Sequence, residues 1–462
     1  MSEGLPTPER YWAMTAISLG IALSVMDASI ANLALPDIAR DLGASASASV
    51  WVVTAYQLAI LGLLLPFASL GERLGYRRVY LWGLSLFTVS SLGCIAAGSL
   101  PMLAGARVVQ GIGAAGMMAV NAALVRMTYP PEMLGRGIAL NSVVVATSSV
   151  AGPTIAAAVL SVAPWQWIFA INLPLGVVVL WLARKSLPHA EPRPAGPLRL
   201  FDTLLNILMF SLVFLGADAI GARAGLDRSG MPLPAAAGLL AAGVAVGIVY
   251  VRRQLHQERP LLPVDLLRIR IFALSMCTSV SAFAAQTLAF VALPFLLLES
   301  QGRGHMQAGF VITMWPVATV CVAPFAGRLI ARHPGGLLGG IGLAVMALGL
   351  AALGLLPAHA SALDMGWRLA LCGAGFGLFQ SPNNHTIVTS APIARAGAAS
   401  GMLGSARLTG QSLGAVMAGV IFSLTGVRDG TGPAIAFALA AGLAATAAVF
   451  SLLRVRPASS PA

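Results

Sequence analysis

The sequence contains little charge. Only 10% of its 462 residues are Asp, Glu, Lys or Arg, whereas 58% are hydrophobic. Globular domains average about a quarter charged residues, and the mean hydropathy of this chain is +0.85. So few charged side chains cannot cover the surface of a soluble protein. The composition therefore excludes a soluble domain and is typical of a polytopic membrane protein.

Lysine and cysteine are also scarce. Lys185 is the single lysine, so the net charge of +12 is carried by arginine. The arginines lie between apolar runs and form no single patch, which argues against a nucleic-acid-binding surface. The four cysteines lie within apolar runs without metal-like spacing. We therefore expect no disulfide framework and no metal site.

Several functional motifs are missing as well. No GxSxG, no HExxH and no phosphate-binding loop is present, so an enzyme, and ATP hydrolysis in particular, is not expected. No cofactor is expected either. The start, MSEGLPTPER, is not followed by a small-residue cleavage site after the first apolar run, so we expect no cleaved signal peptide. An ion gradient or a partner would have to supply any energy.

The chain does contain long apolar runs. A helix crosses a bilayer with about 20 such residues, and fourteen runs qualify. The predicted spans are 11–35, 49–70, 79–99, 102–125, 137–160, 166–183, 201–221, 232–251, 271–298, 308–330, 336–356, 366–388, 398–425 and 432–453. An even number places both termini on the same side.

The basic residues predict which side that is. With the N-terminus inside, 20 basic residues fall in cytoplasmic segments, 6 fall in outer segments, and Arg107 and Arg407 fall inside spans, which accounts for all 28. Cytoplasmic connections of membrane proteins carry the excess of Lys and Arg. The pattern predicts that both termini are cytoplasmic.

Two similar loops predict a repeated architecture. LGERLGYRR (Leu70 to Arg78) and AGRLIARHPGG (Ala326 to Gly336) are both short and basic, contain glycine and are predicted to be cytoplasmic. Parallel repeats of a six-helix unit would place these loops equivalently, if two spans are inserted between the halves. We predict a six-helix bundle over 1–187, a linker with two extra helices over 188–270 and a second bundle over 271–462. The segment Pro260 to Arg270 would lie at the cytoplasmic interface.

Asp27 is the first candidate functional residue. It lies in MDASIANLALP, inside the first predicted span. A charge at mid-membrane costs about 2.5–3.5 kcal/mol on insertion scales, but a carboxyl group that takes up and releases a proton can couple that proton to a second process. The alternative is a solvated aspartate near a helix end. Asn32, in the same stretch, is as compatible with helix packing as with function.

Arg107 is the second intramembrane charge. Gln110 follows three residues later, on the same helix face. Arginine keeps its proton, so Arg107 would hold a carboxylate or water in place rather than titrate. The alternative is that its side chain extends to the nearby interface.

Further candidates lie in other predicted spans. Gly152 and Pro153 in mid-span indicate either a gating seam or a tolerated kink. In the second half, Gln380, Asn383 and Asn384 would line a polar cavity or the cytoplasmic mouth. Arg407 is spaced to contact Gln411, four residues on, and packing or polar networking explains it as well as substrate contact does.

Five of these motifs, in this order, resemble the major facilitator superfamily, and specifically its fourteen-span drug:proton antiporter family, which includes quaternary-ammonium and multidrug exporters. The matching residues are Asp27, Asn32 and Pro36 in MDASIANLALP; Gly75 and Arg77 in GERLGYRR; Arg107, Gln110 and Gly111 in RVVQGIGAAG; Gly152 and Pro153 in AGPTIAAA; and the stretch WQWIFAINLPLG, Trp165 to Gly176. The first loop departs from the family pattern by having Glu72 for Asp and Ala68 for Gly. The second loop has Ala331 in place of its acidic residue.

The resemblance implies a mechanism. Two bundles would rock about a central site, with protons entering as substrate leaves. Asp27 would be the protonation or cation-sensing site, tuned by Arg107, and the loop residues Glu72, Arg73, Gly75 and Arg77 would form a gate. Expected partners are a small-molecule substrate, protons and the lipid bilayer, without nucleic acid. The resemblance places a monomer in a cell's inner membrane and leaves the need for a periplasmic adaptor open.

The leading hypothesis is thus a proton-coupled exporter of lipophilic, cationic small molecules. Asp27 favours cations, but Arg107 and Arg407 keep a second reading open, a dedicated exporter of an endogenous metabolite or organic anion. A membrane sensor or scaffold would need an added soluble domain or long tail, and the last predicted span ends near Leu453.

Overall fold

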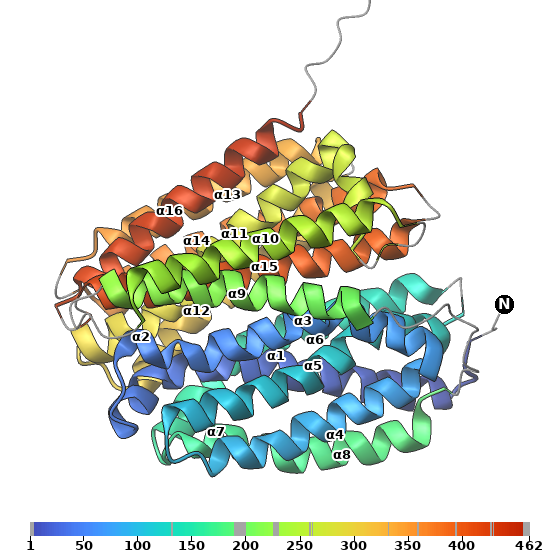
Figure 1. Cartoon of the computed structure of the whole chain (residues 1–462), viewed down its shortest axis with the longest axis horizontal. Helices are drawn as coiled ribbons and strands as arrows, with labels where there is room; N and C mark the ends of the chain where they lie inside the picture. Colours follow the sequence, from blue (N-terminus) through green and yellow to red (C-terminus); the bar gives the residue numbers. More distant parts are fainter. Residues whose placement is uncertain are drawn as a thin grey trace, which may run out of the picture. The chain divides into compact units, whose positions relative to one another are not determined.

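The computed structural model describes residues 4–130, 133–188, 200–224, 231–257, 260, 262–330, 332–357, 360–392, 395–425, 427 and 429–455. All regular structure in these segments is helical (Figure 1). The elements are α1 (Glu9–Asp41), α2 (Ala46–Ser49), α3 (Trp51–Leu74), α4 (Tyr76–Ile95), α5 (Leu100–Thr128), α6 (Leu134–Leu160), α7 (Gln166–Ala170), α8 (Asn172–Ser186), α9 (Leu200–Ala224), α10 (Leu233–Leu255), η2 (Val264–Arg268), α11 (Arg270–Pro294), η3 (Phe295–Ser300), α12 (His305–Leu329), α13 (Gly335–Gly354), α14 (Ala362–Ser390), α15 (Ala396–Leu424) and α16 (Thr431–Leu452).

Local sequence explains where the helices begin and turn. At the start of α14, the Ser361 hydroxyl accepts a hydrogen bond from the Asp364 backbone N–H at 3.0 Å, a typical N-cap. Pro101 lies in the first turn of α5, where its missing N–H costs nothing. Between α3 and α4, Gly75 adopts φ +93°, a conformation that residues with a Cβ rarely adopt. This glycine lets two long helices follow one another with almost no loop.

Within the described residues, twelve helical segments are long and apolar enough to cross a membrane, fewer than the fourteen predicted. α14 and α15 are each 29 residues long but are not among the twelve. Both carry polar residues within their apolar sequence, which dilutes their hydropathy: α14 contains Gln380, Asn383 and Asn384, and α15 contains Arg407 and Gln411. The proline-rich stretch 189–197 and Ala331 lie outside the described residues.

The chain divides into two compact units, Met1–Leu212 and Val213–Ala462. In the first, α5 packs against α3 and α4, while α1 packs against α6 and α8. In the second, α14 packs against α12 and α13, while α11 packs against α15 and α16. The same set of helix contacts thus occurs twice, with α11 in the place of α1. The boundaries predicted at 187 and 270 stay predictions.

Small residues allow the helices to approach closely. A Cβ built on Gly373 of α14 would lie 2.0 Å from the backbone carbonyl oxygen of Trp315 in α12. On Gly113 of α5, it would lie 2.6 Å from the carbonyl oxygen of Gly83 in α4. Real Cβ atoms do not approach backbone so closely, so these two interfaces require glycine. Close contact through small residues is typical of helices in membranes.

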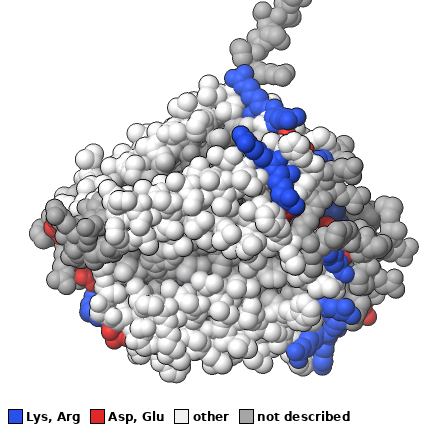
Figure 2. All heavy atoms as spheres, viewed as in Figure 1, with Lys and Arg blue, Asp and Glu red and all other residues white. Residues whose placement is uncertain are grey.

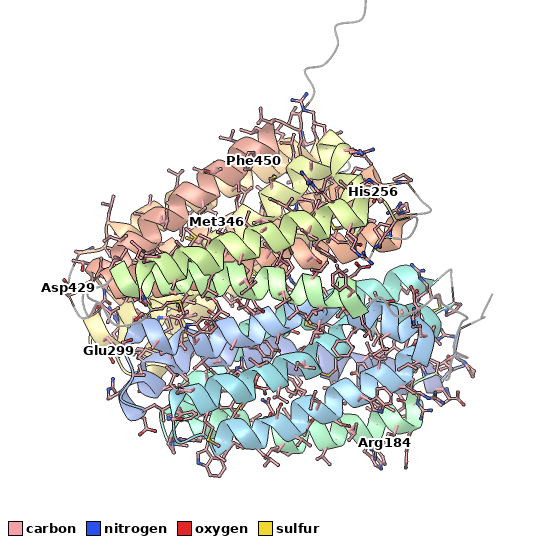
Figure 3. The ribbon with its side chains drawn as sticks, in the orientation of Figure 1. Arg184, His256, Glu299, Met346, Asp429 and Phe450 are labelled. Carbon is pink, nitrogen blue, oxygen red and sulfur yellow. The ribbon has the colours of Figure 1, made fainter. Side chains whose placement is uncertain are left out.

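On the visible surface, charged side chains gather toward the helix ends (Figure 2). The visible sides of the units are nearly free of charge in Figure 2. In the second unit, Glu299 and Asp429 mark one end and His256 the other (Figure 3). The exposed carboxylate of Asp429 accepts hydrogen bonds from the side chain and backbone N–H of Thr431, which lower its pKa. Uncharged middles and charged ends suit helices that cross a bilayer.

Candidate functional site: a buried ion pair in the first unit

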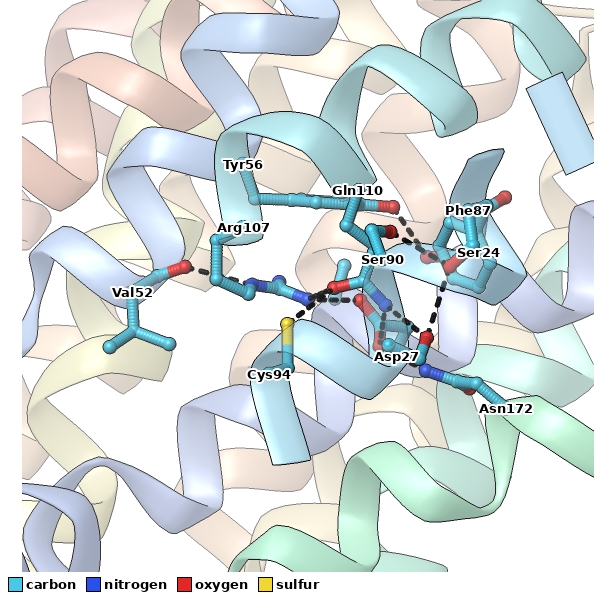
Figure 4. A network of polar contacts seen from close by, with 12 residues as sticks. Ser24, Asp27, Val52, Tyr56, Phe87, Ser90, Cys94, Arg107, Gln110 and Asn172 are labelled. Carbon is cyan, nitrogen blue, oxygen red and sulfur yellow. Dashed lines mark hydrogen bonds and ion pairs between the residues drawn. The ribbon is translucent and has the colours of Figure 1, made fainter. Parts of the chain in front are cut away.

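Asp27 and Arg107 form an ion pair inside the first unit. Asp27 lies on α1 and Arg107 on α5, 80 residues later in the chain, and their Oδ2 and Nη1 atoms are 2.5 Å apart. The side chains are 1% and 0% exposed. Figure 4 shows the two side chains pointing toward each other. Two charges predicted separately from the sequence are therefore one neutral pair.

Two amide side chains complete the coordination of the Asp27 carboxylate. Asn172 of α8 donates from Nδ2 to Asp27 Oδ1 at 2.7 Å, and Gln110 donates from Nε2 to the same oxygen at 3.2 Å (Figure 4). Gln110 Nε2 also donates to the Ser91 hydroxyl of α4 at 3.0 Å. The carboxylate thus receives hydrogen bonds from two helices besides its own, which compensates for its removal from water.

The guanidinium of Arg107 is held from several sides. Its Nε donates to the Val52 backbone carbonyl at 3.0 Å, and its Nη1 donates to Gln110 Oε1 at 2.6 Å. The Tyr56 and Phe169 rings lie with their centroids 4.2 and 5.5 Å from its Cζ, within the range of cation–π attraction. Among the described residues Nη2 has no hydrogen-bond partner. The arginine is fixed in place mainly by Asp27, Gln110 and the rings.

This geometry defines what the pair can do chemically. A proton added to Asp27 would cancel its charge and leave Arg107 as an uncompensated cation in a desolvated site. Such a charge costs several kcal/mol, so protonation favours any rearrangement that rehydrates the guanidinium. Binding of a proton at Asp27 would therefore change the preferred packing of α1 against α5.

Asn32 lies outside this network. It is five residues beyond Asp27 on α1, its Nδ2 donates to the Ala28 carbonyl at 3.3 Å, and its Oδ1 has no partner among the described residues. The hydrogen bond is within the helix, so Asn32 does not link α1 to another element. Its place in the coupling site remains a prediction.

The predicted gating loop joins α3 to α4. Arg77 Nη2 donates to the Arg184 backbone carbonyl at the end of α8, which ties the loop to that helix. Glu72 is exposed and, within the described part of the chain, forms no ion pair. Arg73 is partly buried. The loop's gating role remains a prediction.

Gly152 brings α6 against α1 next to the ion pair. A Cβ on Gly152 would lie 2.7 Å from both Cβ and Oγ of Ser29, two residues after Asp27. Pro153 lies within α6 and removes one backbone hydrogen bond from it. The predicted seam therefore lies beside the helix that carries the aspartate.

In the second unit the predicted polar residues differ in burial and in hydrogen bonding. Asn383 of α14 is fully buried, with Nδ2 donating to the Ser279 hydroxyl at 2.7 Å and Oδ1 accepting from Arg454 at 2.7 Å. Gln380 and Asn384 are partly buried. Arg407 of α15 makes no hydrogen bond to Gln411 in the described structure, although their spacing suggested one.

Arg454 belongs to the same group of contacts as Asn383, and the sequence analysis did not single it out. Just beyond α16, it donates to the hydroxyls of Ser275 at 2.8 Å and Ser451 at 2.5 Å. Burial lowers the pKa of its guanidinium to about 10. It therefore links the end of α16 to α11 and α14. No sequence signal distinguished it from the other arginines that follow apolar runs.

Asn172 was a recognisable residue that sequence reasoning did not single out. It is the one polar amide between Trp167 and Trp181 in an otherwise apolar stretch. Asn172→Leu is expected to remove a hydrogen bond to a charged group, worth about 1.5–3 kcal/mol, and to slow proton-coupled transport about tenfold or more. Transport and thermal unfolding of the purified variant would test this.

Asn206→Leu is the matched control. Asn206 is equally buried in the same unit and donates to the Gly62 carbonyl at 2.8 Å, away from Asp27. Both substitutions should destabilise the protein, but only Asn172→Leu should change proton coupling. Equal effects on coupling would show that Asn172 contributes only to folding.

The two units of helices, with a neutral ion pair buried in the first, define a polytopic helical membrane protein. The chain belongs to the Major Facilitator Superfamily, whose model matches residues 17–415 and 274–462. It is a transporter and not an enzyme.

Three relatives illustrate the range of the family. The chain is 50% identical to the uncharacterized transporter YebQ of Escherichia coli, over 98% of this chain and 97% of that protein. It is 29% identical to the riboflavin transporter RibZ of Clostridioides difficile, covering 88% and 87%. It is 30% identical to the multidrug resistance protein Stp of Mycobacterium tuberculosis, covering 89% and 75%. Its fold is also similar to a POT family transporter, with a TM-score of 0.72 at 16% identity and 95% coverage of both chains.

Proposed function

We propose that this protein is a proton-coupled exporter of lipophilic small molecules that works by alternating access in a bacterial inner membrane. The buried Asp27–Arg107 pair is the observation that carries the proposal. A carboxylate enclosed by apolar helices is expensive, and a purely structural site would be served by uncharged residues of similar volume. Drug-resistance relatives such as Stp support export.

In the proposed cycle, a proton from outside reaches Asp27 and neutralises it. Arg107 then loses its counter-ion, and Gln110 and Asn172 lose their charged acceptor. The unit relaxes toward the conformation that releases cargo outside. Loss of the proton to the cytoplasm restores the pair and resets the carrier. In each cycle, Asp27 therefore carries one proton from the outside to the cytoplasm.

The proposed topology has fourteen spans with both termini in the cytoplasm. α14 and α15 would add two spans to the twelve that length and composition identify. Each is 29 residues long, or about 43 Å at 1.5 Å per residue, which exceeds the hydrocarbon core of about 30 Å. The three-part division at 187 and 270, a monomeric state and the gating roles of Glu72, Arg73, Gly75, Arg77, Gly152 and Pro153 belong to the same proposal.

Cargo charge is the part of the hypothesis that the ion pair affects most. The preference for cations was argued from Asp27 as the main intramembrane acid, and the charge of Asp27 is compensated by Arg107. This observation favours the second candidate function, export of a metabolite or organic anion. One relative is a riboflavin transporter, which supports an aromatic cargo that need not be a cation.

The decisive experiment compares wild type with Asp27→Asn. In everted vesicles with an imposed pH gradient, wild type is expected to release protons when a transported compound is added, whereas Asp27→Asn should not. The variant should still exchange labelled for unlabelled cargo across the membrane, because exchange requires no net proton movement. Full proton-driven transport by Asp27→Asn would refute the proposed coupling.

Asp37→Asn serves as the control on the same helix. Asp37 lies near the end of α1, ten residues after Asp27, and its Oδ1 is 3.4 Å from the exposed Arg40 guanidinium. The substitution makes the same chemical change away from the buried network. Proton coupling should therefore remain in this variant.

A further inference from the structure

Arg407 lies deep in α15. It comes three residues before Gly410, the middle residue of the 29-residue helix, which corresponds to about 5 Å along the helix axis. The start of the helix is 11 residues away, or about 16 Å. A side chain that extends to the membrane interface needs a position near a helix end. Arg407 is therefore placed where an arginine is expensive.

Among the described residues, no protein group compensates the charge of Arg407. The Nε atom of Arg407 is buried and has no hydrogen-bond partner, and in the described structure its guanidinium forms no ion pair. Arg107 and Arg454, by contrast, each donate to three or more oxygen atoms. Arginine keeps its proton, so Arg407 cannot escape the cost by becoming neutral. Within the described structure, Arg407 thus lacks the acceptors that the buried Arg107 and Arg454 have.

The surroundings of Arg407 on its own helix are small and apolar. One and two turns further on, Gly410 and Gly414 pack directly against the Val280 and Ala284 carbonyls of α11. Ala406 is buried in an apolar cluster with Met402. Arg407 and Gln411 lie one turn apart and are both only partly buried. One face of α15 is thus polar and carries the Arg407 guanidinium, which has no acceptor in the described structure.

We propose that Arg407 binds an anionic group of the transported molecule, so that the cargo is a lipophilic organic anion such as an aromatic carboxylate or sulfonate. The inference rests on the proposed function and specifies its substrate class. A guanidinium binds carboxylates through two parallel hydrogen bonds, and the cargo would supply the acceptors that the protein lacks. Asp27 is paired with Arg107, so its carboxylate is not available to select a cationic cargo.

The test uses fluorescent probes that share a ring system and differ in charge. Fluorescein and rhodamine 6G are both xanthenes, the first anionic and the second cationic. Pyrenebutanoate and pyrenemethylammonium form a second pair. Everted vesicles with an imposed acidic interior and no membrane potential would be offered each probe. Weak acids do not accumulate passively in an acidic compartment, so accumulation of an anion reports transport.

Wild type is expected to accumulate the anionic member of a pair in preference to the cationic member. Arg407→Gln should weaken anion transport about 10- to 100-fold, as expected for loss of a charge-assisted bidentate contact. Arg407→Lys should retain part of the activity, since it keeps the charge and loses the fork. Arg328→Gln, which removes an exposed arginine from the last turn of α12, should behave like wild type.

A binding measurement separates recognition from folding. Pyrenebutanoate should raise the unfolding temperature of purified wild type and should not raise that of Arg407→Gln. Unchanged anion transport by Arg407→Gln, or transport of the cationic probes alone, would overturn the inference and leave the proposed exporter intact. Proton release driven only by uncharged compounds would do the same. If no compound releases protons, the proposed function itself fails, and the inference with it.

Discussion

Arg107→Leu is expected to produce the largest loss of both stability and transport of any single substitution in the first unit. It leaves the Asp27 carboxylate buried without its counter-ion, and breaking a buried pair in this way costs about 3–5 kcal/mol. It also removes the contacts to the Val52 carbonyl and to the Tyr56 ring. Thermal unfolding in detergent and vesicle transport would measure the two losses.

A double variant distinguishes an unpaired charge from lost packing. Asp27→Asn combined with Arg107→Gln removes both charges and keeps side chains that can bond to each other. It should recover at least half of the stability lost in Arg107→Leu and should recover no proton coupling. If the double variant is as unstable as Arg107→Leu, the destabilisation comes from packing and not from the unpaired carboxylate.

Gly373→Ala is expected to have the second largest effect. The added methyl group would meet the Trp315 carbonyl oxygen at 2.0 Å, and the other nearest atoms, at 2.8 and 3.0 Å, are also backbone. Backbone cannot move aside as a flexible side chain can, so α12 and α14 must separate. We expect a loss of about 3 kcal/mol, at the upper end of usual overpacking costs, measured as reduced yield and a lower unfolding temperature.

Gly238→Ala is the control for that substitution. Gly238 lies on α10, and a Cβ there would have no neighbour within 4 Å. Alanine favours a helix over glycine by up to about 1 kcal/mol, so this variant should be as stable as wild type or more so. Wild-type stability in Gly373→Ala would show that the two helices can shift without cost.

The sequence predicted the helices well because each is coded locally. Apolar runs separated by basic loops defined the class, and α1 (Glu9–Asp41) contains the predicted 11–35 span. The number of membrane-capable helices was harder to predict, because polar residues in α14 and α15 lower their hydropathy. Such residues serve contacts within the folded protein, as Asn383 does with Ser279.

The candidate site was predictable only in part. Asp27, Arg107 and Gln110 were recognisable as polar residues in apolar runs, and the i, i+3 spacing placed the last two on one face. Their meeting depends on how α1 faces α5, and that information lies in the packing of the whole unit. For the same reason the sequence could not show that Arg107 has a counter-ion whereas Arg407 has none.

The arrangement around Asp27 has a mechanical consequence. Hydrogen bonds connect this carboxylate, directly or through Arg107 and Gln110, to α3, α4, α5 and α8. Five helices therefore share one electrostatic anchor, and none can slide far without disturbing it. While Asp27 keeps its charge, these contacts resist the sliding of any one of the five helices past the others. A proton bound to Asp27 would weaken contacts that involve all five helices at the same time.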